Sequence, residues 1–230
     1  MKLTLSLFLF FFQLSALADF KDCTSFFPDS NIPTLTLPYK TKELCFKSFA
    51  IFYSIDSKTP IYGIERLNKE ILSTKKNRSN NFHEELNLEF SERSELSDYI
   101  HSGYDRGHII PAGNQDDEIS MKESFSLANM IPQAPQNNRK IWSKIESDTR
   151  KYVKRATGNV YVFTGPYYEN HNTVIGKNKV WVPTHIWKLV YDANTKKSWV
   201  FWVENKDGVA MTAPISYEEF IKKTGYKLLP

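Results

Sequence analysis

The sequence predicts a single α+β domain in which helices flank a central antiparallel sheet. Three runs rich in Val, Tyr and Trp, at residues 160–164, 179–192 and 197–204, have the composition of strands. A further segment, 136–157, carries apolar side chains at helical spacing and is followed by a glycine. No convincing linker divides the chain, so we expect residues 19–230 to form one domain.

Residues 1–18 have the layout of a secretory signal peptide. Lys2 supplies a positive charge, an apolar run follows over 3–14, and Ala16-Leu17-Ala18 is a small-x-small cleavage site. The run is shorter than the roughly 20 residues of a membrane-spanning helix, so cleavage is favoured over a retained anchor. We therefore expect export to the periplasm or the medium, with no membrane span left after cleavage.

Cys23 and Cys45 are the two cysteines of the sequence. In an oxidising compartment an isolated pair is expected to form one disulfide. It would tie an N-terminal arm, residues 20–42, to the body of the domain. A zinc site is the alternative, and it is disfavoured because two thiols without nearby histidines are too few ligands.

The segments between the arm and the first motif have weaker patterns. Residues 46–54 and 60–67 are apolar with partial alternation, which predicts two strands joined by a turn. Residues 69–95 are polar and charged, which is typical of a loop. A turn is expected over 109–115, where a proline and a glycine occur, and a short closing helix over 217–223.

Composition sets only broad limits on function. Hydrophobic residues make up 41% and charged residues 24% of the 230 residues, which favours a packed core over global disorder. No repeat of roughly 20 to 50 residues is visible, which disfavours a solenoid or a propeller. The 30 Lys and Arg against 26 Asp and Glu give a net charge of +4, which is compatible with a polyanionic partner without requiring one.

Residues 103–112 concentrate chemically active side chains. Asp105, Arg106 and His108 lie within four residues, and Gly107 between them permits close backbone approach. In an extended segment Arg106 and His108 would share one face, while Asp105 would point away. A guanidinium that binds phosphate beside a neutral imidazole that accepts a proton suits an anionic substrate.

A second group of polar residues runs from Asn129 into the predicted helix. Glu146 and Arg150 are four residues apart and share a helical face. Asn138 and Glu146 are about 12 Å apart along a regular helix, so they could serve one ion only if Asn138 lay on a bent or non-helical start. One amide oxygen, with a carboxylate acting through water, would suit Mg²⁺, which commonly keeps several waters.

Together these segments form a pattern more specific than any of its parts. The residues that carry it are Arg78, Asp105, Arg106, Gly107, His108, Pro111, Ala112, Asn129, Pro132, Gln133, Asn138, Glu146 and Arg150. Their order and spacing resemble the sugar-non-specific DNA/RNA endonucleases over about residues 78–164. The resemblance implies a ββα-metal (His-Me finger) core on the central antiparallel sheet.

The resemblance also implies a reaction and its principal groups. His108 would be the general base that activates water for attack on phosphorus. Asn138 would be the direct ligand of Mg²⁺, which Mn²⁺ could replace, and Glu146 would act on the ion through water. The reaction would hydrolyse DNA, with RNA as a second expected substrate, with little sequence specificity and would leave 5′-phosphate ends.

The remaining residues of the pattern would support that reaction. Arg78, Arg106 and Arg150 would contact phosphate or stabilise the charge that develops as the bond breaks. Asp105 and Asn129 would support the geometry of the site from positions behind the residues that contact the ion or the substrate. The sequence does not predict the oligomeric state.

Simpler interpretations stay open for several of these residues. Asn138 could be a helix N-cap, Glu146 with Arg150 a surface ion pair, Arg78 a loop arginine among lysines, and Asp105 the partner of an arginine in a turn. The whole chain could bind nucleic acid without cleaving it, or be a structural secreted domain in which the motif is coincidental. Only hydrolysis needs both a base and a metal site.

Overall fold

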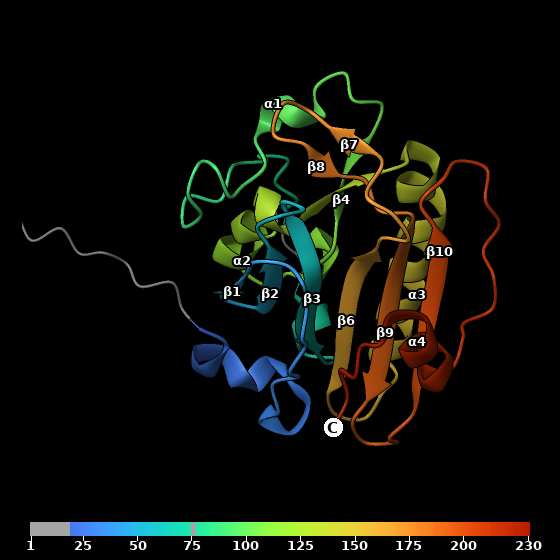
Figure 1. Ribbon diagram of the computed structural model, residues 1–230. Helices are drawn as coiled ribbons and strands as arrows, with labels where there is room; N and C mark the ends of the chain where they lie inside the picture. Colours follow the sequence, from blue (N-terminus) through green and yellow to red (C-terminus); the bar gives the residue numbers. More distant parts are fainter. Residues whose placement is uncertain (1–18, 75–76) are drawn as a thin grey trace, which may run out of the picture.

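A six-stranded antiparallel sheet forms the centre of the molecule in the computed structural model, which describes residues 19–74 and 77–230 (Figure 1). The strand order is β1-β2-β3-β6-β9-β10. These strands are β1 (Thr41–Cys45), β2 (Phe49–Ser54), β3 (Thr59–Leu67), β6 (Val160–Tyr167), β9 (His185–Asp192) and β10 (Ser198–Glu204). The α+β prediction with a central antiparallel sheet is confirmed, while the expected signal peptide, 1–18, lies outside the described residues.

Two details of the strands differ from the prediction. The run 179–192 contains two strands, β8 (Val180–Trp181) and β9, with Pro183 between them, where the chain lacks a backbone donor. Strand β1 begins inside the predicted arm because its first three residues, Thr41–Glu43, are polar and half-buried and show no hydrophobic alternation. β8 pairs with β7 (Val174–Ile175) in a separate small ribbon.

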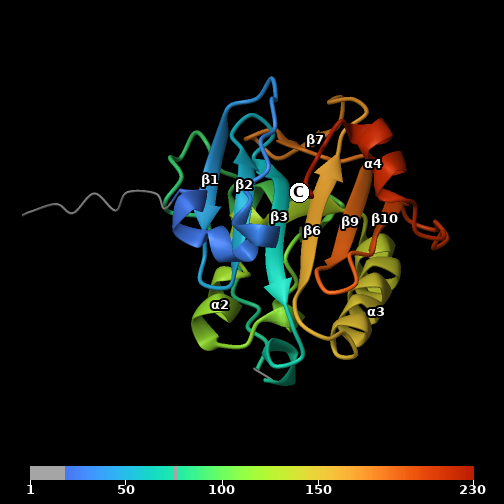
Figure 2. The same ribbon diagram turned by 90° about the horizontal axis from the view of Figure 1, so that it is seen from below.

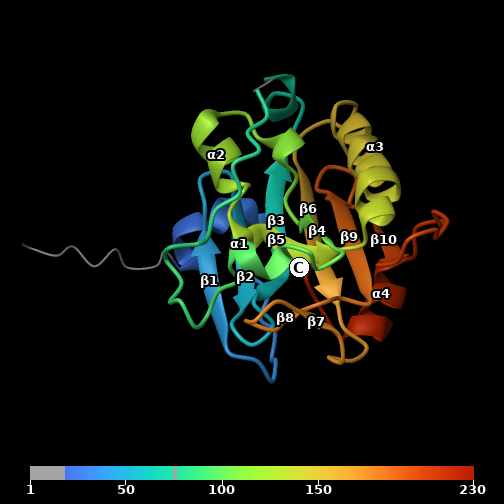
Figure 3. The same ribbon diagram turned by 90° about the horizontal axis from the view of Figure 1, so that it is seen from above.

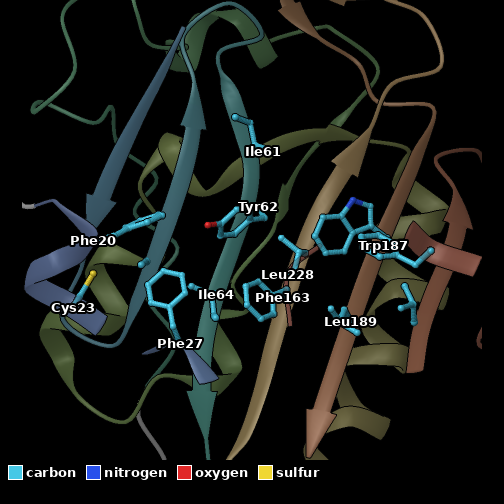
Figure 4. Packing of buried hydrophobic residues seen from close by; sticks show 13 residues of the cluster. Phe20, Cys23, Phe27, Ile61, Tyr62, Ile64, Phe163, Trp187, Leu189 and Leu228 are labelled. Carbon is cyan, nitrogen blue, oxygen red and sulfur yellow. The ribbon is translucent and has the colours of Figure 1, made fainter. Parts of the chain in front are cut away.

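One face of the sheet is covered by the N-terminal arm and by helix α4 (Tyr217–Thr224). The arm begins with the 3₁₀ segment η1 (Phe20–Phe26), whose Phe20 packs with Phe27, Tyr62 and Phe163 in one buried cluster (Figure 4). Phe220 of α4 joins the same cluster. The predicted disulfide between Cys23 and Cys45 is present and joins η1 to the end of β1.

The opposite face carries the segments that build the site. In Figure 1, α4 lies in front of the sheet and α3 (Ser143–Val153) behind it, and the view from below in Figure 2 shows α3 beside the same edge strands. A second buried cluster, with Ile51, Ile109, Trp142 and Ile145 among its members, fills the space between the sheet and these segments. Helix α2 (Glu118–Glu123) and the short helix α1 (Leu96–Tyr99) lie toward the periphery.

A two-stranded hairpin followed by a helix lies over the middle of the sheet. Strands β4 (Asp105–His108) and β5 (Met130–Gln133) pair antiparallel, with His108 opposite Met130. β5 contacts β3, and the view from above in Figure 3 shows the hairpin across the sheet with α3 to one side. A Cβ on Gly107 would overlap the side chain of Gln133 on the partner strand, so the close pairing of β4 with β5 requires glycine at this position. Among the described residues, no helix has the length and apolarity to cross a bilayer.

Candidate active site

A cavity of about 660 Å³ opens between β4, the start of α3 and the loop that contains Arg78. Seven of the eight residues to which the sequence assigns a role in the reaction line it: Arg78, Asp105, Arg106, His108, Asn138, Glu146 and Arg150. The eighth, Asn129, is buried behind the cavity wall. The fold therefore brings together residues that are up to 72 positions apart in the sequence.

Strand β4 presents Arg106 and His108 toward this cavity, as expected for alternate residues of an extended segment. Asp105 was expected to point away, but it also lines the cavity, at the edge next to Asn138. The Arg106 guanidinium lies 4.2 Å from the centre of the Phe82 ring. The His108 ring packs edge-on against Phe125, with ring centres 4.9 Å apart, and lies 5.6 Å from Phe82. The two phenylalanines thus fix both functional side chains.

His108 is 9% exposed, and its Nε2 has no hydrogen-bond partner within the part of the chain that the structure describes. Burial, reinforced by the positive charges of Arg78 and Arg106, lowers the pKa of His108 to about 3. The imidazole is therefore neutral at physiological pH, which is the state that a general base requires.

Asn129 fixes the backbone directly after His108. Its Nδ2 donates to the carbonyl oxygens of Ile110, at 2.9 Å, and Ser124, at 2.8 Å, and its Oδ1 accepts from the Ile110 amide at 2.8 Å. All of these bonds are buried. Asn129 can therefore hold the His108 segment in place but does not itself reach the cavity.

Asp105 pairs with an arginine and also orients Asn138. Its carboxylate accepts two hydrogen bonds from Arg139, at 2.6 and 2.8 Å, and one from Asn138 Nδ2 at 3.0 Å. Because the amide nitrogen of Asn138 is engaged in this way, its Oδ1 is the atom left for a ligand. Asp105 does pair with an arginine, but from strand β4 and not in a turn, and this pairing is compatible with a supporting role.

Asn138 and Glu146 reach one cavity because the helix does not begin as a regular α-helix. Residues Asn137–Trp142 form a π-helical turn, η6, that runs directly into α3. Eight residues of α-helix turn the chain by about 800° and leave two side chains about 80° apart. A π-turn accommodates one extra residue, so the same eight residues turn by about 700° and place both within about 20° of one face.

The neighbouring residue Asn137 has a different role from that of Asn138. Asn137 is buried, its Oδ1 accepts from Gln133 Nε2 at 2.8 Å, and its Nδ2 donates to the Glu204 carbonyl at 2.6 Å. The N-cap position of this helix belongs to Gln136, whose side chain makes no capping bond. Asn138 is therefore neither a cap nor a structural amide, and it faces the cavity.

Glu146 and Arg150, both on helix α3, also line the cavity, and 3.9 Å separates Glu146 Oε2 from Arg150 Nη1. Burial raises the pKa of Glu146, while the charges of Lys188, Arg150 and Arg78 act in the opposite direction. The ion pair exists, but both partners also line the cavity, so it is not merely a pair on the outer surface of the helix. Arg78 completes the wall and lies 5.4 Å from the Phe125 ring centre.

The donor set of the cavity suits a hard divalent cation that keeps much of its water. Asn138 Oδ1 and the Glu146 carboxylate are oxygen donors of the kind that Mg²⁺ prefers. No cluster of three or more His, Cys, Asp or Glu suited to a metal occurs within residues 19–74 and 77–230. A closed structural zinc site therefore does not fit the described residues, whereas a largely hydrated Mg²⁺ does.

A sequence profile of the DNA/RNA non-specific endonuclease family matches residues 28–229. The chain belongs to this family. Mitochondrial endonuclease G of Bos taurus is 34% identical over 155 residues, which cover 62% of this chain and 52% of the relative. Mitochondrial nuclease EXOG of Homo sapiens is 29% identical over 162 residues, which cover 65% and 44%.

The chain spans about half the length of the curated relatives that it matches. A chain in the crystal structure of the EndoG/EndoGI complex aligns with a TM-score of 0.73 and 27% identity, covering 83% of this chain and 86% of that one. The resemblance inferred from the motif and the ββα-metal fold are both confirmed.

Several residues at the site were not singled out by the sequence. Arg139 directly follows Asn138, but its bidentate pairing with Asp105 depends on the hairpin. Glu65 and Lys188 lie on sheet strands and are 2% and 1% exposed. The one signal available in the sequence was a charged residue next to apolar residues in a predicted strand.

Proposed function

We propose that this protein is a Mg²⁺-dependent endonuclease that hydrolyses phosphodiester bonds of DNA, and also of RNA, with little sequence specificity. The observation that carries the proposal is the shared cavity: the neutral His108 and the oxygen donors of Asn138 and Glu146 all line it. A base beside a hard-metal site is needed for hydrolysis and not for binding. Family membership supports the same activity.

In this reaction His108 accepts the proton of the water that attacks phosphorus. The new bond joins the water oxygen to phosphorus, the bond to the 3′-oxygen breaks, and that oxygen takes a proton from solvent. The products are a 5′-phosphate and a 3′-hydroxyl. A divalent ion at Asn138 and Glu146 would supply positive charge to offset the charge on the phosphate and the leaving oxygen.

Three arginines surround the position of the phosphate. Arg78, Arg106 and Arg150 all line the cavity, and their fixed charges would stabilise the negative charge that grows on the phosphate oxygens. Contacts to phosphate alone carry no sequence information. Low sequence specificity and inhibition by salt both follow from this mode of binding.

The proposed location is outside the cytoplasm, in the periplasm or the medium. The signal-peptide pattern of residues 1–18 supports export, and so does the Cys23–Cys45 disulfide, since such bonds persist in oxidising compartments. The names of several relatives place those proteins in mitochondria, and this location is not carried over to the present chain.

Digestion of plasmid DNA tests this function. We expect the purified protein to degrade a supercoiled plasmid and a structured RNA with Mg²⁺, with Mn²⁺ as a substitute, and EDTA to stop both reactions. His108→Ala should lose cleavage while retaining DNA binding. His171→Ala is the matched control, because His171 is an exposed histidine that does not line the cavity. A plasmid that is bound but left intact with either metal would support the binding-only alternative instead.

A further inference from the structure

A chain of two hydrogen bonds, the first buried and the second partly buried, connects the central sheet to Arg150. Glu65 Oε1 accepts from Asn114 Nδ2 at 2.8 Å, and Asn114 Oδ1 accepts from Arg150 Nη1 at 3.2 Å. Glu65 is 2% exposed and Asn114 is 5% exposed. We call these three residues the Glu65 relay; only its last member, Arg150, lines the cavity.

The relay starts at a rigid point of the fold. Glu65 lies on β3, one of the two middle strands, opposite Phe49 of β2 on one side and Val162 of β6 on the other. Asn114 closes the 3₁₀ turn η4 (Ala112–Asn114), which follows the His108 strand. The sheet and the turn thereby fix the acceptor that faces the Arg150 guanidinium.

A buried cation compensates the charge of the relay. Lys188 on β9 is 1% exposed, and its Nζ donates to Thr164 Oγ1 at 2.7 Å. Its charge lowers the pKa of both Glu65 and Glu146, although burial is the larger influence on each and raises the pKa of Glu65 to about 7. The cluster therefore combines two acidic side chains, Glu65 and Glu146, with two basic ones, Lys188 and Arg150.

Fold stability alone does not account for such a cluster. Burying charged groups requires their desolvation, and well-packed apolar residues at such positions are often as stable or more so. The guanidinium also lies close to Gly113, where an added Cβ would be only 3.3 Å from Arg150 Nη1. A larger residue at position 113 would therefore crowd the Arg150 side chain at the wall of the cavity.

We propose that Glu65 and Asn114 are positioning residues of the nuclease reaction, which hold the Arg150 guanidinium beside Glu146 and toward the substrate phosphate. This inference rests on the proposed endonuclease function. Loss of the relay should reduce kcat more than it changes KM, because the misplaced charge is needed most as the bond breaks.

A double-mutant cycle tests whether Asn114 acts through Arg150. Asn114→Ala should lower kcat roughly 10- to 100-fold, the range found for residues that orient the ligands of a catalytic metal. In an Arg150→Ala background the same change should have an effect of about twofold or less, because the side chain that it positions is gone. If instead the double variant loses kcat by the product of the two single-variant factors, the two residues act independently and the proposal is wrong.

Variants of Glu65 provide a second arm. Glu65→Leu leaves Asn114 Nδ2 unpaired and should resemble Asn114→Ala, whereas Glu65→Gln retains an acceptor oxygen and should recover most of the rate. Asp192→Asn is the matched control, since Asp192 is another buried carboxylate on the sheet but does not line the cavity. Its variant should lose stability without a selective loss of kcat.

A measurement independent of cleavage separates this inference from the proposed function. Nitrogen-15 NMR of the guanidinium groups, with Arg150 assigned through Arg150→Lys, reports rotation of the group in the wild-type protein. Slow rotation that becomes fast in Asn114→Ala supports the relay, even if the wild type cleaves no nucleic acid. Fast rotation in the wild type refutes the relay, even if the protein is an active nuclease.

Discussion

Protonation of His108 should destabilise the folded protein in a defined pH window. Its pKa is about 3 in the folded protein because of burial and the nearby arginines, against an ordinary value of 6.5. Above pH 6.5 the imidazole is neutral in both the folded and the unfolded state. Below 6.5 the unfolded chain binds a proton that the folded protein refuses, so the free energy of unfolding falls as the pH is lowered toward 3.

The size of this effect follows from the two pKa values. Between pH 8 and pH 5 the loss amounts to about 2 kcal/mol of unfolding free energy, and the full difference of pKa corresponds to about 5 kcal/mol. At pH 5 the folded protein is still almost entirely unprotonated at His108. The figure for this interval therefore depends mainly on the ordinary pKa of the unfolded chain.

Urea unfolding of the wild type and of His108→Asn at pH 8 and pH 5 isolates this contribution. All other titrating groups are common to both proteins, so the wild type should lose about 2 kcal/mol more than the variant over this interval. If the free energy of unfolding fell by the same amount in both proteins, His108 would titrate with an ordinary pKa in the folded protein. The buried, neutral base described here would then be wrong.

Three further changes should each have a measurable effect. Replacing Cys23 and Cys45 with serine opens a loop with a sequence separation of 22, which should remove about 3 kcal/mol and lower the calorimetric Tm by roughly 10 °C; an unchanged Tm would contradict this. Asp105→Ala releases Asn138 and Arg139, so half-maximal cleavage should need roughly 10- to 100-fold more Mg²⁺; a superimposable Mg²⁺ titration would exclude the orienting role. Raising the salt concentration from about 50 to about 200 mM should lower cleavage at limiting enzyme at least about tenfold, and a salt-independent rate would argue against phosphate-dominated binding.

The catalytic strand and its helix could be predicted because their signals are local. The extended segment that contains Arg106 and His108 needed only the alternation of a strand to place both side chains on one face. The disulfide needed only the count of cysteines. Strands β3 and β6 and helix α4 follow their own apolar patterns closely, since each buries one face in the core.

The meeting of Asn138 with Glu146 could not be derived from helical spacing alone. The spacing identified the difficulty, and the π-helical turn resolves it. That turn accompanies the burial of Asn137 by Gln133 and Glu204, and Glu204 is more than 60 residues away in the sequence. Long-range packing of this kind leaves no periodic signal.

Glu65 and Lys188 escaped prediction for a related reason. Each shares its strand with another charged residue, Arg66 in β3 and Asp192 in β9, and a charged residue in a strand can as easily face solvent as the interior. Strand order and the position of the hairpin decide which face is buried. Only the assembled sheet places both residues beneath the cavity.

The most direct test of the account is a crystal structure of the His108→Ala protein with a short DNA duplex and Mn²⁺, located by its anomalous scattering. We expect one strong peak at Asn138 Oδ1, with the scissile phosphate between the ion and the space vacated by the imidazole. A phosphate outside the cavity, or an ion bound without Asn138, would contradict the mechanism.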